Sequence, residues 1–136
     1  YGERLTAVRP CDDFVLAVVV PPFLLATAEV YLRWDRLGEP EGAPVEARYL
    51  PDSLRDVAPL VNDLTPAAVD LAPELGDWIA DLRRAWGVPV LMSGSGPSLF
   101  GFFATPGEAA EAIEVVRGGR AARVCLPVAS GVRVDS

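Results

Sequence analysis

The stretch Leu91–Phe103, LMSGSGPSLFGFF, places a Gly-Ser-Gly-Pro sequence between two apolar runs that are typical of strands. A link this short must reverse the chain, and glycine supplies the positive φ values that tight turns need. A two-residue Asn-Gly turn would be enough for reversal alone. Here serine hydroxyls alternate with bare backbone, a composition that also suits anion binding. Two interpretations stand side by side, a β-hairpin turn and a phosphate-facing loop of Gly94, Ser95, Gly96, Pro97 and Ser98.

Strands are predicted on both sides of this loop and at two other places. Residues 89–93 and 98–103 flank the loop, and FVLAVVV at residues 14–20 is apolar on both faces, which indicates a central strand. Pro21 and Pro22 end that strand, because proline cannot donate to a ladder. AARVCLPV at residues 121–128 is predicted as the last core strand, with residues 130–136 as a candidate edge strand.

Helix start signals, a capping side chain or a proline in the first turn, occur at five places. They are Thr27, Asp52 before residues 53–61, Thr65 with Pro66, Pro73, and the capping box Thr105–Glu108 before residues 106–117. Gly38 and Gly87 are predicted to end two of these helices. Residues 38–51 are rich in proline, glycine and glutamate and are predicted to be a loop.

The resulting order is strand, several helices, strand, strand, helix, strand. This order predicts an α+β fold, a ferredoxin-like split βαβ sandwich. Its antiparallel sheet of about four strands would have helices packed on one face and extra helices in the first crossover. The 136 residues have the length of one domain, and no repeat or second core is visible.

Composition excludes several classes of function. The net charge is −7, which disfavours a nucleic-acid partner. The sequence has no histidine, and its two cysteines, Cys11 and Cys125, have no metal-ligand spacing. We expect both to be reduced thiols in a cytoplasmic protein with no metal site of its own. The longest apolar run is broken by a Pro-Pro pair, so no membrane partner is expected.

Three motifs together resemble the C-terminal domain of the GHMP small-molecule kinases, and within them the 4-diphosphocytidyl-2-C-methyl-D-erythritol kinases. The resemblance covers nearly the whole chain, from GERLTAV to the last strand. The motifs are FVLAVVVPPFLLATAEVYLRWD at residues 14–35, VNDL at residues 61–64 and MSGSGPSLFGFF at residues 92–103.

The resemblance implies transfer of the ATP γ-phosphoryl group to a hydroxyl of a cytidine diphosphate-linked polyol, in non-mevalonate isoprenoid biosynthesis. It implies that the loop of residues 94–98 lies near phosphates, that Thr27 faces the catalytic cleft and that Tyr31 stacks on cytosine. From the residues alone, Thr27 is equally an N-cap, and Tyr31 fits core packing beside Trp34 better than base stacking. The resemblance places the two interpretations of Tyr31 side by side. Asn62 and Asp63 are expected to shape a turn and to cap the helix near Thr65.

The resemblance also implies a missing half. The family's Gly/Ser-rich ATP loop, its lysine and its catalytic aspartate belong to an N-terminal domain that has no counterpart in this sequence. We therefore expect no catalytic residue in this chain. ATP and magnesium would be held mainly by the missing domain in cis, no cofactor would bind here, and the isolated chain would be inactive. The first residue, Tyr1 rather than Met, favours a piece of a longer protein.

Two alternatives remain open. The first is another GHMP kinase, acting on mevalonate, homoserine or a sugar, for which an aromatic residue at Tyr31 would have no base to stack on. The second is a free-standing ferredoxin-like module that binds a small ligand or dimerises through a sheet edge.

Overall fold

A single antiparallel sheet organises the chain. The computed structural model describes residues 13–57 and 60–126, and its strands are β1 (Val15–Val20), β2 (Leu91–Met92), β3 (Leu99–Phe103) and β4 (Ala121–Cys125). They pair in the order β2-β3-β1-β4, with all neighbours antiparallel. This order and the helices between the strands confirm the predicted α+β, ferredoxin-like fold, with β1 at the centre.

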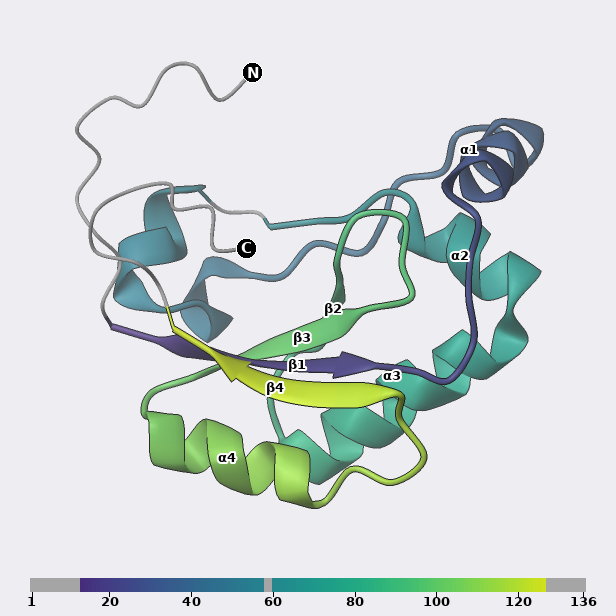
Figure 1. Ribbon diagram of the computed structural model, residues 1–136. Helices are drawn as coiled ribbons and strands as arrows, with labels where there is room; N and C mark the ends of the chain where they lie inside the picture. Colours follow the sequence, from purple (N-terminus) through teal and green to yellow (C-terminus); the bar gives the residue numbers. More distant parts are fainter. Residues whose placement is uncertain (1–12, 58–59, 127–136) are drawn as a thin grey trace, which may run out of the picture.

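The helices lie mainly in the first crossover, as predicted. They are α1 (Thr27–Arg36), α2 (Thr65–Leu71), α3 (Pro73–Trp86) and, after β3, α4 (Pro106–Glu114), with two 3-10 helices, η1 (Ala47–Tyr49) and η2 (Asp52–Val57). Figure 1 shows α3 and α4 along one face of the sheet, and α1 and α2 beyond one of its ends. None of the helices in the described ranges is long and apolar enough to cross a membrane.

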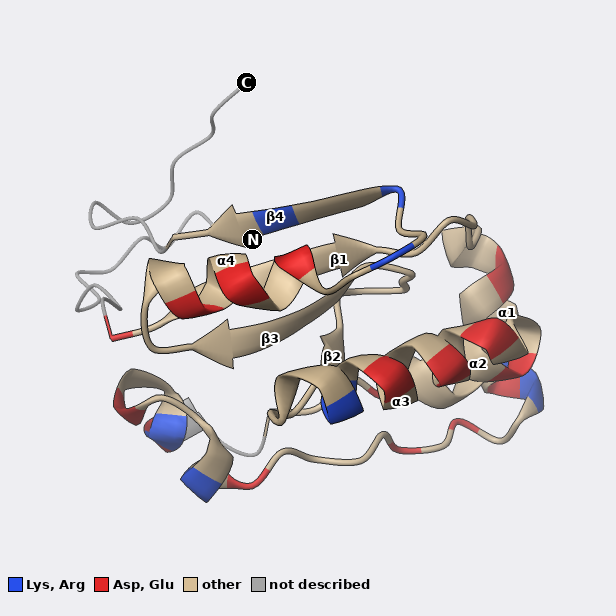
Figure 2. Ribbon diagram, turned by 90° about the horizontal axis from the view of Figure 1, so that it is seen from below, with Lys and Arg blue, Asp and Glu red and all other residues tan. Residues whose placement is uncertain are grey.

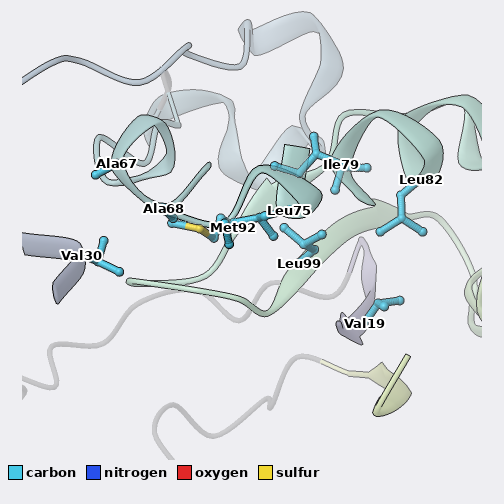
Figure 3. Close-up of a cluster of buried hydrophobic side chains, with 11 residues drawn as sticks. Val19, Val30, Ala67, Ala68, Leu75, Ile79, Leu82, Met92 and Leu99 are labelled. Atoms are coloured by element: carbon cyan, nitrogen blue, oxygen red, sulfur yellow. The ribbon is translucent and has the colours of Figure 1, made fainter. Parts of the chain in front are cut away.

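The core forms between β1 and the helix layer. Along β1 every second residue, Val15, Ala17 and Val19, is buried, as a strand with one fully covered face requires. Val19 joins Leu99 of β3 and the apolar stripe of α3, Leu75, Ile79 and Leu82, in the cluster of Figure 3. The acidic residues of α3 and α4 lie on the outside of this layer (Figure 2), so much of the negative charge is on a solvated face.

The register of β1 and β3 decides which loops meet. Val19 is paired with Leu99, so the end of β1 lies beside the start of β3. Because the strands are antiparallel, the chain that leaves β1 and the chain that enters β3 are at the same end of the sheet. The segment leading to α1 and the loop between β2 and β3 are thereby neighbours, although the sequence separates them widely.

Three of the predicted helix caps are wrong. Ala26, not Thr27, is the N-cap of α1, and Leu64, not Thr65, is the N-cap of α2, with no side-chain cap hydrogen bond in either case. Asp52 lies inside the 3-10 helix η2, where an α-helix over residues 53–61 was expected. Both threonines are therefore the first residue of their helix rather than its cap, and the Thr27 hydroxyl bonds to Ser95 instead.

Other predicted boundaries are confirmed. Thr105 Oγ1 accepts a hydrogen bond from the Glu108 N–H at 3.1 Å, and Gly87 ends α3 in the left-handed region at φ 69°. The last helix, α4, ends at Glu114 rather than at residue 117. The Arg117 guanidinium donates to the Glu114 carbonyl at 2.8 Å and so satisfies one of the terminal carbonyl groups.

The last strand differs from its prediction. β4 is an edge strand, partly exposed, because its only partner among the described residues is β1. Cys125 is a half-buried free thiol opposite Leu16. Cys11, residues 127–128 and the candidate edge strand at residues 130–136 lie outside the described residues.

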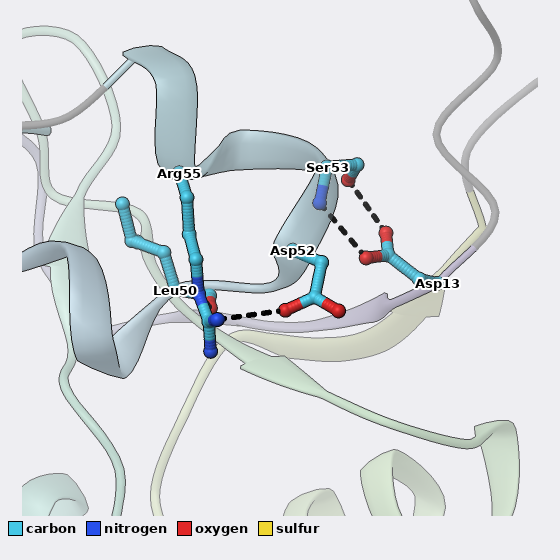
Figure 4. A network of polar contacts seen from close by, with 5 residues as sticks. All are labelled: Asp13, Leu50, Asp52, Ser53 and Arg55. Carbon is cyan, nitrogen blue, oxygen red and sulfur yellow. Dashed lines mark hydrogen bonds and ion pairs between the residues drawn. The ribbon is translucent and has the colours of Figure 1, made fainter.

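The start of β1 is tied to η2 by a carboxylate. Asp13 accepts from the Ser53 N–H at 2.9 Å and from the Ser53 hydroxyl at 2.5 Å (Figure 4). The neighbouring Arg55 pairs with Asp52 at 3.0 Å. The hydrogen bonds from Ser53 favour the charged carboxylate and hold the pKa of Asp13 below its ordinary value.

We predict that this contact makes stability pH-dependent. A lowered folded-state pKa means that the Asp13 contribution is present above the unfolded value of 3.8 and is lost as pH falls through the folded value. Asp13→Asn should therefore lower the free energy of unfolding at pH 7 but not at pH values below both pKa values. Urea unfolding at both pH values measures this. Asp52→Asn, which breaks an exposed pair instead, is the control.

We also predict that a side chain at Gly101 destabilises the fold. An added Cβ would lie 3.0 Å from Trp86 Cε3, and Trp86 is held in place by its indole N–H, which donates to the Ala112 carbonyl at 2.9 Å. Gly101→Ala should destabilise the fold by about 1–3 kcal/mol through overpacking. Gly107→Ala, whose Cβ would meet nothing closer than 3.9 Å, should not. Equal unfolding midpoints for the two variants would contradict this.

Candidate functional site

The candidate site forms where the start of α1 meets the loop between β2 and β3. Thr27 Oγ1 and Ser95 Oγ are 3.0 Å apart, hydrogen-bonded across 68 positions of sequence. Figure 1 shows the loop projecting from the sheet toward α1. The register of β1 and β3 brings together two residues that the sequence singled out separately, and Thr27 does so as the first residue of the helix rather than as its cap.

The loop is a tight hairpin turn in which some backbone N–H groups have no acceptor among the described residues. Gly94 and Gly96 have φ values of 56° and 88°, and an added Cβ at Gly96 would lie 2.7 Å from Met92 Sδ. The Ser93 N–H donates to the Ser98 carbonyl at 2.9 Å, and the Gly96 N–H donates to the Ser93 carbonyl at 3.0 Å. Within residues 13–57 and 60–126, the Gly94 and Ser95 N–H groups have no acceptor. The loop is therefore a β-hairpin turn, as one of the two interpretations has it. The second interpretation, a phosphate-facing loop, stays open.

The start of α1 adds further donors at the same place. No side chain caps this helix, so the N–H groups of its first turn have no side-chain acceptor. The ten residues of α1 also carry a helix dipole whose positive end is at Thr27. A helix start and a glycine loop that both present N–H groups are the usual elements of an anion site.

Asn62 holds the loop from behind, a contact that the sequence did not reveal. Its Nδ2 donates to the carbonyls of Met92 and Gly94, both at 2.7 Å. Its Oδ1 accepts from the Leu64 N–H at 2.9 Å, which confirms the predicted turn before α2. The neighbouring Asp63 accepts from the Gly42 N–H at 2.9 Å, so the turn is anchored on two sides. Only the Asn-Asp-Leu motif signalled this turn in the sequence.

Tyr31 lies on the exposed side of α1. Its side chain is 51% exposed, so of the two interpretations of Tyr31 the one that packs it in the core beside Trp34 is wrong. Trp34 takes that role instead, packing against the core while its indole N–H donates to the Pro40 carbonyl at 2.9 Å. Tyr31 follows Thr27 by four positions, which places it one turn further along the same helix face. An exposed aromatic ring thus lies one helix turn from Thr27.

The donor set suits an anion and not a metal ion. The described residues contain no cluster of three or more acidic, histidine or cysteine side chains that could hold a metal. The Asp63 carboxylate is already bound to Gly42, and the Arg33 guanidinium is paired with Asp70 of α2. Magnesium requires oxygen ligands, whereas this surface presents mainly N–H and O–H donors. Neutral donors of this kind suit phosphate oxygens.

The surface is open rather than enclosed. Thr27 and Gly94 are exposed, and Ser95 is half-buried. Two hollows elsewhere, one between α3 and α4 that includes Trp78, the other beside residues 43–49 that includes Arg83, contain neither the loop nor α1. Thr27, Gly94 and Ser95 therefore form an open surface.

Comparison with similar proteins identifies the family of this chain. The family described as GHMP kinases C terminal matches residues 47–119, more than half of the chain. A protein of Streptomyces coelicolor named 4-diphosphocytidyl-2-C-methyl-D-erythritol kinase is 38% identical over 96% of this chain and 46% of its own length. One of Pelotomaculum thermopropionicum with the same name is 36% identical over 76% of this chain and 37% of its own length.

A solved structure agrees with these relatives. The crystal structure of 4-(cytidine 5'-diphospho)-2C-methyl-D-erythritol kinase superposes with a TM-score of 0.64 and 30% identity, over 83% of this chain and 42% of that one. The chain thus spans less than half the length of each of these three proteins. The family match and the shared fold together show that the chain belongs to the GHMP kinases, as a C-terminal domain of that family.

Proposed function

We propose that the chain is the substrate-side half of a kinase that phosphorylates a hydroxyl of 4-diphosphocytidyl-2-C-methyl-D-erythritol with ATP. The hydrogen bond between Thr27 and Ser95 carries this proposal, because it joins the start of α1 to the glycine loop. The names of the relatives and of the solved structure support the choice of substrate.

In this proposal the loop of residues 94–98 faces phosphates. Phosphoryl transfer depends mainly on positioning and on stabilising charge, so donors can act without a catalytic base. The Gly94 and Ser95 N–H groups and the Ser95 and Thr27 hydroxyls would donate to phosphate oxygens. The bare backbone of Gly94 allows an oxygen to approach closely, and Pro97 and Ser98 complete the turn that holds these donors in place.

Tyr31 gives the proposed site its preference for a nucleotide. The phenol ring is exposed on the same face of α1 as Thr27. A cytosine ring stacked on it gains aromatic contact, worth about 1–3 kcal/mol per base in comparable sites. The diphosphate of the same molecule would then reach the donors at Thr27 and Ser95. A substrate without a base, such as a simple sugar, would leave the ring unused.

The rest of the site belongs to the part of the kinase outside this chain. The donors at Ser95 and Thr27 are neutral, whereas a transferring phosphoryl group also needs cations and a positioned nucleophile. We propose that the N-terminal domain in cis supplies the catalytic residues and holds most of the ATP. Magnesium would neutralise phosphate charge on that side. The isolated chain would then have no kinase activity.

We predict that removing either hydroxyl impairs phosphoryl transfer. In the full-length kinase, Ser95→Ala or Thr27→Val should each lower kcat/KM at least tenfold, as expected for a lost transition-state donor. The double variant should lose less than the product of the two effects, because the two hydroxyls are bound to each other. Ser93→Ala, in the same loop, is the matched control. Normal steady-state kinetics for Ser95→Ala and Thr27→Val would rule out this role.

We further predict that Tyr31 contributes to substrate affinity. Tyr31→Ala should raise KM for the cytidine diphosphate-linked polyol about tenfold or more and leave KM for ATP unchanged, whereas Tyr31→Phe should keep both. Leu32→Ala controls for loss of an exposed apolar side chain on the same helix, since Leu32 is 57% exposed. An unchanged KM in Tyr31→Ala would favour a GHMP kinase whose substrate has no base.

A further inference from the structure

The Asn62 side chain has all the contacts that its carboxamide needs. Both donor contacts go to carbonyls of the loop segment, those of Met92 and Gly94, and the oxygen accepts from Leu64. A carboxamide in the reverse orientation would place its oxygen against two carbonyl oxygens, so the donors alone fit here. The turn before α2 therefore holds two carbonyls, those of Met92 at the end of β2 and Gly94 in the loop, through one side chain.

These carbonyls decide where the loop N–H groups point. In a trans peptide the C=O and the following N–H point in opposite directions. Directing the Met92 carbonyl toward Asn62 turns the Ser93 N–H away, where it meets the Ser98 carbonyl. Directing the Gly94 carbonyl toward Asn62 likewise points the Ser95 N–H away from Asn62. That N–H has no acceptor within the described part of the chain.

The turn that contains Asn62 and Asp63 is also held by contacts with Gly42, on the side away from the glycine loop. Asp63 accepts from the Gly42 N–H at 2.9 Å, and an added Cβ at Gly42 would lie 2.2 Å from the Asn62 carbonyl oxygen. Gly42 therefore packs directly against the Asn62 backbone. Close packing against Gly42 therefore holds the Asn62 backbone in addition to the Asp63 hydrogen bond, so Asn62 should stay in place when only the Asp63 side chain is removed.

We propose that Asn62 is a positioning residue for phosphoryl transfer: by binding the Met92 and Gly94 carbonyls, it aims the Ser95 N–H at the phosphate. This inference rests on the proposed function for its effect on catalysis, and on the contacts themselves for its effect on the loop. Asn62 need not touch substrate. Without its donors the glycines of the loop are free to adopt other φ values, and the Ser95 N–H loses its direction.

Asn62→Asp in the full-length kinase tests this most directly. It keeps the shape and the oxygen that accepts from Leu64 but replaces the donors with a carboxylate oxygen, which repels both loop carbonyls. We expect kcat to fall at least tenfold while equilibrium binding of cytidine, which carries the base but no phosphate, stays within twofold, because Tyr31 is untouched. Asp63→Ala, which releases the Gly42 side only, should keep kcat within about threefold even if it lowers the unfolding temperature.

A second measurement does not depend on activity. In selectively ¹⁵N-labelled full-length wild-type protein, the Gly94 and Ser95 amides should have order parameters of about 0.85, typical of rigid backbone. In Asn62→Asp they should fall below about 0.6, whereas Asp63→Ala should leave them unchanged. A flexible loop in the wild type, or equal kcat in Asn62→Asp and Asp63→Ala, would overturn the inference. If the wild type lacks kinase activity but the order parameters behave as expected, the proposed function fails and the loop clamp stands.

Discussion

The pairing of β1 with β3 is the constraint on which the site depends. β1 is hydrogen-bonded on both edges and buried along one face, so its position in the sheet cannot shift without exposing Val15, Ala17 and Val19 together. A slip of one residue would turn these side chains to the other face. The register therefore places the exit of β1 beside the entry of β3, and α1 and the glycine loop must meet there.

The interaction between Thr27 and Ser95 follows from that register rather than from local sequence. Each hydroxyl lies at the start or middle of a segment that would be unremarkable alone, a helix start and a hairpin turn. Their hydrogen bond brings the start of α1 and the glycine loop into contact. The third contributor, Asn62, stands behind the loop and satisfies its carbonyls, which leaves the donors on the opposite side.

Sequence reasoning succeeded where the local signal was strong. The β-branched run of β1, the capping box at Thr105, the Gly87 helix end and the split βαβ order are all present as predicted. It failed at Thr27 and Thr65, which are the first residues of α1 and α2 rather than their caps, so each helix begins one residue earlier than expected. It left Tyr31 as either a core residue or a stacking residue, because a helical stripe does not say which of its edges is covered. Trp34 is at the covered edge and Tyr31 at the exposed one.

The sequence by itself determined the class of fold, the family resemblance and the residue types of the loop, because hydrophobic period, glycine placement and helix signals are local properties. Only the tertiary structure decided that Thr27 binds Ser95 rather than capping α1, that Tyr31 is exposed and that Asn62 holds the loop. These contacts join residues 30 or more positions apart, or depend on which face a neighbour covers. The strand register and helix packing that set them arise only when the whole chain has folded.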